Sequence, residues 1–123
     1  MLNDDIEPIL DFALKHLRYT DRDLLRDYIN EHNKYGTIDY AIDDKGNIIA
    51  MCRWNMSVDG DVAIILDFCI DKEWRNKGFC KNFILRAMEK FPKIEKLQFI
   101  RGVRGDFRIR LLSIKKILNS NIF

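Results

Sequence analysis

The sequence of 123 residues predicts an α/β (α+β) fold with a mixed, twisted sheet and helices on both faces. Three observations predict it. Apolar residues recur at helical spacing over residues 4–35 and then at every second position from Thr37 onward. The nearly unbroken apolar run Val62–Ile70 is typical of a strand that is covered on both faces at the centre of a sheet. A helical pattern and another strand follow it, which implies a right-handed parallel crossover.

Two helices are expected first. Apolar side chains over residues 4–18 fall at i, i+3, i+4, i+7 and i+8, which forms one stripe of a helix. Pro8 lies near its start, where the missing N–H does least harm. The cap-like segment 20–23 begins a second helix, which ends at 34–36 beside a glycine.

Alternation over residues 37–42 and 48–56 predicts two antiparallel strands joined by a polar turn. In the second strand, Ala50, Cys52, Trp54 and Met56 share one face, and the residues between them share the other. A glycine turn then leads into the central strand.

A helix over residues 79–91 and a strand over 97–103 are expected after the central strand, with Pro92 ending the helix. Residues 107–118 fit a strand by their alternation and a helix by the spacing of their larger apolar residues. We favour a hairpin, a strand to about Leu112 and then a short helix.

Composition indicates one globular domain over residues 1–123, with 47% hydrophobic and 33% charged residues. No apolar run approaches the ~20 residues of a membrane span, and the acidic start does not resemble a signal peptide. Cys52, Cys69 and Cys80 are odd in number and lack metal-ligand spacing, so we expect reduced thiols and no metal site. These features predict a cytoplasmic protein.

Charge is divided unevenly along the chain. Residues 1–71 hold 7 Lys or Arg and 15 Asp or Glu, whereas residues 72–123 hold 14 and 4. Unless the two halves interleave in space, one pole of the domain should attract an anion.

The segment after the central strand carries the strongest chemical signal. A loop with Arg75 and Lys77 leads through Gly78 into a helix whose first N–H groups lack partners. Those groups and the helix dipole attract anions, and a glycine lets a phosphate approach the backbone closely. The two basic residues add countercharge. The pattern predicts a pyrophosphate site.

Residues 70–80 resemble motif A of the GNAT superfamily of acyl-CoA-dependent N-acetyltransferases, written (Q/R)xxGx(G/A). Arg75 stands at the Q/R position and Gly78 at the first glycine, and Cys80 replaces the usual Gly or Ala. The order of elements over residues 4–103 agrees with that family.

The resemblance implies that acetyl coenzyme A is the cosubstrate and that a primary amine of an unidentified acceptor receives the acetyl group. It implies a coenzyme site formed by one strand end and by the turn beyond it. The strand residues, whose backbone would pair with the pantetheine arm, are Phe68, Cys69 and Ile70; the turn residues are Arg75, Asn76, Lys77, Gly78, Phe79, Cys80 and Lys81. The strand 97–103 should diverge from the central strand to make room.

Asp67 is the catalytic candidate, because it is the only carboxylate on the central strand and lies where many family members carry an acidic residue. As a base it would take the proton of the incoming ammonium group. The alternative is an Asp bonded to backbone where the strands diverge. The family's tyrosine acid has no counterpart, since no tyrosine follows Tyr40. Cys80 is not favoured as a nucleophile, since it should pack inside the helix start.

The resemblance implies a trimmed member without the first strand and the C-terminal hairpin of the full family fold, similar to small relatives encoded by bacteriophages. Such a protein would work in the host cytoplasm, and it could be a degenerate member that serves as a structural or binding module. Whether it is an enzyme is left open. Open sheet edges must be paired, covered or charged, so we expect a homo-oligomer.

Nucleic-acid binding is a second, less favoured alternative. The C-terminal half carries basic residues that could follow phosphates and two aromatic residues that could stack on bases. They are Arg101, Arg104, Arg108, Arg110, Lys115 and Lys116, with Phe99 and Phe107. No nucleic-acid recognition motif accompanies them.

Overall fold

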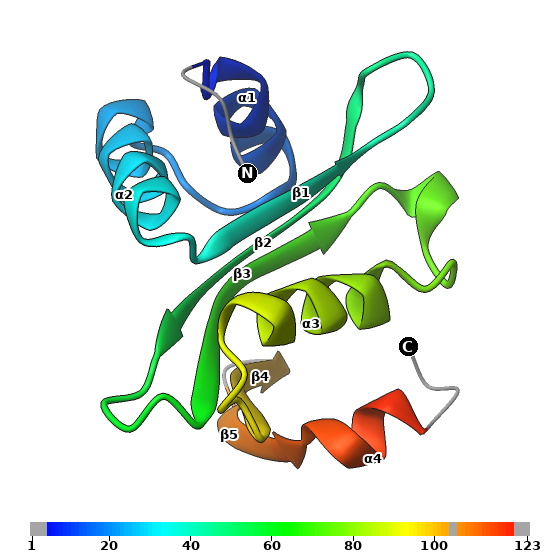
Figure 1. The fold of residues 1–123 in the computed structure, drawn as a ribbon. Helices are drawn as coiled ribbons and strands as arrows, with labels where there is room; N and C mark the ends of the chain where they lie inside the picture. The colour runs from blue at the N-terminus through cyan, green and yellow to red at the C-terminus, as the bar shows by residue number, and fades with distance from the viewer. Residues whose placement is uncertain (1–4, 104–105, 120–123) are drawn as a thin grey trace.

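The fold is a single five-stranded sheet with two helices on each face (Figure 1). The structure is a computed structural model that describes residues 5–103 and 106–119, without the side chains of 100–103 and 106–110. In chain order its elements are α1 (Glu7–His16), α2 (Arg22–Tyr35), β1 (Ile38–Ile42), β2 (Ile48–Met56), β3 (Val62–Ile70), the 3₁₀ turn η1 (Lys72–Trp74), α3 (Phe79–Lys90), β4 (Lys96–Val103), β5 (Asp106–Ser113) and α4 (Ile114–Leu118). The predicted order is confirmed, including a strand followed by a short helix at the end.

The first two helices begin and end at the residues that local chemistry favours. Pro8 lies in the first turn of α1. The Asp21 carboxylate accepts a hydrogen bond from the Leu24 N–H at 3.1 Å and caps α2. Gly36 ends α2 in the left-handed region at φ 72°. The apolar stripes of both helices then pack on one face of the sheet.

The sheet is mixed, as predicted, in the order β1-β2-β3-β4-β5. Strands β1, β2 and β3 form an antiparallel meander, β3 and β4 are parallel, and β5 returns antiparallel to β4. Helix α3 makes the crossover between the two parallel strands. The apolar run Val62–Ile70 is therefore the central strand.

Strands β3 and β4 diverge after a short stretch of pairing. Only Val62, Ala63 and Ile64 pair with β4, and beyond Ile64 no described strand occupies that edge of β3. This agrees with the divergence that the family resemblance implied. It also corrects the expectation that β3 is covered on both faces: Leu66 is 40% exposed and Phe68 is 37% exposed, because the neighbouring strand turns away.

A β-bulge changes which way β3 presents its side chains. Arg53 of β2 pairs with Asp67, but the next residue, Trp54, pairs with Ile65, so Leu66 is an extra residue. Before the bulge, Ala63 and Ile65 belong to the core on the α3 side. After the bulge the odd-numbered residues change face, and Asp67 lies opposite Arg53 on the side of α1 and α2.

Two apolar cores lie on the two faces of the sheet. One joins α1 and α2 to residues such as Ile38 and Met51. The other joins α3 and α4 to the face of β2 that carries Ala50, Cys52 and Trp54, as the alternation predicted. No helix within residues 5–103 and 106–119 is long and apolar enough to cross a membrane.

Candidate functional site

The turn between β3 and α3 exposes backbone N–H groups at a helix start. Asn76 and Gly78 both have left-handed backbones, with φ of 64° and 85°. Gly78 directly precedes α3, and no side chain caps the helix there. A Cβ added at Gly78 would meet no atom within 4 Å, so the space above this backbone is open. The geometry suits an anion held by the first N–H groups of α3.

A pocket of about 410 Å³ opens beside this turn, and we call it the turn pocket. The residues that line it come from the end of α1, the end of β3 and the turn: His16, Leu17, Phe68, Cys69, Ile70, Arg75, Asn76, Gly78, Phe79 and Cys80. Eight of the ten residues predicted for coenzyme binding are among them. The other two, Lys77 and Lys81, follow lining residues in the chain but do not line the pocket. All ten roles remain predictions.

Side chains close to the turn help to hold its shape. The rings of Trp74 and Phe79 meet edge to face with centroids 6.2 Å apart. Arg75 Nε donates a long hydrogen bond of 3.4 Å to the Ile70 carbonyl oxygen at the end of β3. The Arg75 guanidinium therefore lies over the strand end from which the turn starts.

His16 lines the turn pocket and was not anticipated from the sequence. Its Nε2 lies 2.9 Å from Asp71 Oδ1, although the geometry is not that of a hydrogen bond. The Phe12 ring, one helical turn earlier, lies 4.3 Å from the His16 ring between centroids. His16 and Asp71 are 55 residues apart in the chain, so no local pattern could have joined them.

Asp67, the predicted base, lies in a buried cluster with Arg53 and Tyr19. Arg53 donates to Asp67 Oδ2 from Nε at 2.7 Å and lies 2.6 Å from it through Nη2. The Tyr19 hydroxyl donates toward the two Asp67 carboxylate oxygens, which lie 2.9 Å and 3.1 Å away. The same hydroxyl oxygen accepts a hydrogen bond from Arg53 Nη2 at 2.8 Å. The side chains of Arg53 and Asp67 are only 5% and 6% exposed. The hydrogen-bond partners that the described residues give Asp67 are thus side chains, and not the backbone groups of the alternative interpretation.

This cluster brings a tyrosine hydroxyl to the middle of the sheet. Burial, and then the negative charge of Asp67, raise the pKa of Tyr19, so the phenol stays protonated at neutral pH. The family resemblance places the tyrosine acid late in the chain, where no tyrosine follows Tyr40. Tyr19 comes instead from the connection between α1 and α2. The alternation in β2 predicted that Arg53 lies on this face, but it did not predict that Asp67 is its partner.

A second cavity of about 530 Å³, which we call the splay cavity, lies between α3, α4 and the part of the sheet where β3 and β4 diverge. It shares Leu17, Phe68 and Cys80 with the turn pocket, so the two lie side by side. Burial raises the pKa of the Cys80 thiol, which agrees with the view that Cys80 is not a nucleophile. The buried Trp54 Nε1 has no hydrogen-bond partner among the described residues.

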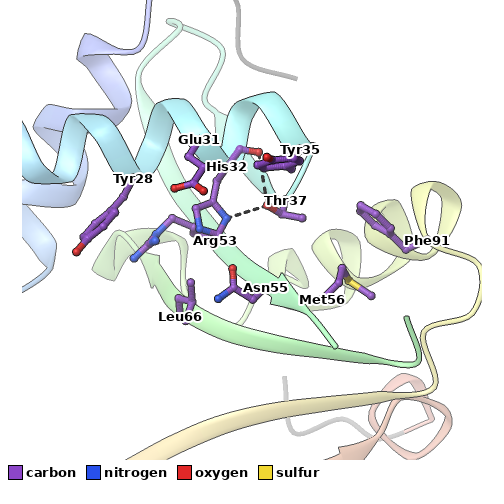
Figure 2. A pocket seen from close by; sticks show the side chains of 10 residues that line it. All are labelled: Tyr28, Glu31, His32, Tyr35, Thr37, Arg53, Asn55, Met56, Leu66 and Phe91. Atoms are coloured by element: carbon purple, nitrogen blue, oxygen red, sulfur yellow. Dashed lines mark hydrogen bonds between the residues drawn. The ribbon is translucent and has the colours of Figure 1, made fainter. Parts of the chain in front are cut away.

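A third pocket of about 660 Å³, the α2 pocket, lies between α2 and the sheet (Figure 2). Tyr28, Glu31, His32 and Tyr35 line it from α2, and Leu66 on β3 lines both this pocket and the splay cavity. Burial, and then the charge of Arg53, lower the pKa of His32, whose Nδ1 lies 2.8 Å from Thr37 Oγ1. His32 is therefore neutral at pH 7.

The basic residues considered for nucleic acid are only partly described. Lys115 and Lys116 are exposed on α4, and Phe99 lines the splay cavity. The residues whose side chains lie outside the described part are Arg101, Arg104, Phe107, Arg108 and Arg110. Within the described residues, no three His, Cys, Asp or Glu side chains are grouped as metal ligands would be.

Comparison with known families identifies this arrangement. Residues 4–104 match the model of the acetyltransferase (GNAT) family. That range includes both parallel strands, the turn pocket and the cluster around Asp67. No curated protein matches the sequence significantly.

Solved structures agree at the level of the fold. A GNAT family N-acetyltransferase from Escherichia coli in complex with CoA is similar with a TM-score of 0.57 and 12% identity, over 97% of this chain and 82% of that one. Spermidine N-acetyltransferase from Vibrio cholerae in complex with CoA and spermine is similar with a TM-score of 0.60 and 15% identity, over 97% of this chain and 95% of that one. A dodecameric structure of that enzyme has a TM-score of 0.60 and 16% identity, over 97% of this chain and 94% of that one. At these identities the similarity establishes the fold.

Proposed function

The chain belongs to the acetyltransferase (GNAT) family, and from this membership we propose that residues 1–123 form one domain that transfers an acetyl group from acetyl coenzyme A to a primary amine. One observation carries the proposal. Beyond Ile64 no described strand pairs with this edge of β3, and the strand leads through the turn 71–78 to an uncapped helix start with a left-handed glycine. An extended arm can pair with such an edge while its phosphates meet the helix N-terminus.

The residues of the turn pocket fit a coenzyme of this chemistry. The N–H groups from Asn76 to Lys81 would hold the pyrophosphate, and Arg75 and Lys77 would add positive charge. The backbone of Phe68–Ile70 would pair with the pantetheine arm. The arm would then carry the thioester toward Leu66, which lines both the splay cavity and the α2 pocket.

The α2 pocket is the proposed acceptor side. Arg53 there is paired with Asp67, which leaves the Glu31 carboxylate beside tyrosine rings and a neutral His32. A carboxylate and aromatic faces attract an ammonium group. The acceptor's free amine would attack the thioester carbonyl carbon, a C–N bond would form, and the C–S bond would break. The leaving thiolate would take a proton from water.

Asp67 remains the proposed base, through a water molecule rather than by direct contact with the acceptor, because its carboxylate is buried against Arg53 and Tyr19. The same contacts give it a structural role. These two roles make different predictions for variants of Asp67 and Arg53.

Acetyl coenzyme A is expected to raise the melting temperature of the protein, because a ligand that binds only the folded state stabilises it. At a ligand concentration of about 100 Kd the gain is about 2.7 kcal/mol, which corresponds to roughly 10 °C for a domain of this size. A thermal-shift titration measures this effect. Acetyl transfer to a panel of primary amines is then measured through the release of free thiol.

Three results would contradict parts of the proposal. If the coenzyme produces no shift, the coenzyme site is wrong. If the coenzyme binds but no amine is acetylated, the chain acts as a degenerate binding module. If short oligonucleotides raise the melting temperature with a steep salt dependence and the coenzyme does not, the basic C-terminal half is the functional surface.

We also propose that the protein is a homo-oligomer. β1 and β5 are the edge strands of the sheet, and Ile42 and Leu111 on them are about half exposed. Exposed apolar strand edges favour pairing with a second chain. Light scattering at increasing concentration is expected to give at least the mass of a dimer, and a constant monomer mass would contradict the proposal.

A further inference from the structure

The splay cavity is large enough to hold a small organic ligand. Its volume is about 530 Å³, within the usual range of ligand pockets. Apolar side chains of β3, α3 and α4 line it, among them Ile65, Phe83, Ile84 and Ile117. Its lining is apolar apart from Asp67, and a mainly apolar cavity binds apolar ligands more readily than water.

The cavity begins where the reacting end of the coenzyme would arrive. It reaches the short paired stretch just before β3 and β4 separate, since Ala63 and Leu97, the second of their three pairs, line it. It lies next to the turn pocket, with which it shares the lining residues Leu17, Phe68 and Cys80. A coenzyme held in the turn pocket with its arm along β3 would therefore direct its acyl group into this cavity.

One polar group in the cavity wall lacks a partner. The indole N–H of Trp54 is buried and makes no hydrogen bond within the described residues. Buried donors are nearly always satisfied by protein, water or ligand. An acyl thioester brings a carbonyl oxygen, which can accept such a bond, together with an apolar chain for the remaining surface.

We propose that the splay cavity is an acyl-chain site and that the protein uses acyl-CoA donors longer than acetyl-CoA, of about six to eight carbons. This inference rests on the proposed function of the turn pocket. At ~30 Å³ for each heavy-atom group, a chain of this length occupies roughly 200 Å³, well within the cavity. The reaction is unchanged: the acceptor nitrogen bonds to the acyl carbon, the C–S bond breaks, and the thiolate is protonated by water.

A series of acyl donors tests the inference by binding alone. The affinities of CoA, acetyl-CoA, butanoyl-CoA, hexanoyl-CoA and octanoyl-CoA are measured by calorimetry on the full chain. Each buried methylene is expected to tighten binding about three- to fourfold, so hexanoyl-CoA should bind about 100-fold more tightly than acetyl-CoA. Equal affinities for acetyl-CoA and hexanoyl-CoA would overturn the acyl-chain site while leaving the proposed function intact. Failure of every CoA compound to bind would overturn both.

A cavity-filling variant supplies the second test. Ala87 lies on α3 and lines the cavity, so Ala87→Leu is expected to reduce the preference for hexanoyl-CoA over acetyl-CoA by about tenfold or more. Ala41→Leu is the control, because Ala41 packs against the same core without lining the cavity. It should retain the full preference. If Ala87→Leu and Ala41→Leu retain the same preference, the inference is wrong; melting temperatures establish that each variant is folded.

Discussion

Gly78→Val is expected to lose the thermal shift with acetyl coenzyme A, with an affinity at least about 100-fold weaker than that of the wild type. The glycine lies at φ 85° directly before α3, and the space that a Cβ would enter is open in the free protein. In the complex that space is the proposed position of the pyrophosphate. A valine side chain would block it, and its preference for negative φ would move the N–H groups of the turn.

The matched control is Gly60→Val. Gly60 has φ 77°, and a Cβ there also meets no atom within 4 Å, so the backbone strain is comparable. It lies in the turn before β3, at the opposite end of that strand from the turn pocket. Both variants should lose about 1–2 kcal/mol of stability, but only Gly78→Val should lose coenzyme binding. Equal loss of binding in both would attribute the effect to strain, and normal binding by Gly78→Val would refute the coenzyme site.

Asp67→Asn is expected to have two large effects. An amide cannot take the ammonium proton, so acetyl transfer should fall about 10²-fold or more with little change in coenzyme affinity. The substitution also leaves Arg53, which is 5% exposed, without its carboxylate. Removing one partner of a buried ion pair costs about 3–5 kcal/mol of unfolding free energy. Turnover must therefore be measured at a temperature where circular dichroism shows every variant to be folded.

A double-mutant cycle with Arg53→Met separates the two roles. Arg53→Met alone should lose stability but keep turnover within about tenfold, because the carboxylate is still present. The double variant should recover most of the stability, since neither charge is left unpaired. If Asp67 is the base, turnover stays low in the double variant. If turnover recovers together with stability, the role of Asp67 is structural and its carboxylate only neutralises the buried Arg53.

Much of the fold could be predicted because it depends on local patterns. The stripe over residues 4–18, the alternation from Thr37 and the apolar run of β3 each reflect which face of an element is buried. The turn at Gly78 was equally predictable, since a left-handed backbone and an uncapped helix start are local properties. These patterns indicated the order of the elements and the mixed sheet, whereas the family resemblance indicated most of the residues that line the turn pocket.

The tertiary structure decided what lies between the elements. The bulge at Leu66 turns Asp67 toward Arg53, and no alternation pattern shows an extra residue inside an apolar run. Tyr19 reaches Asp67 across 48 positions of the chain. The divergence of β4 leaves Leu66 and Phe68 exposed although their sequence reads as fully buried. Periodicity reports how each residue faces its own element, whereas contacts and cavities depend on how separate elements approach one another, which only the packed chain determines.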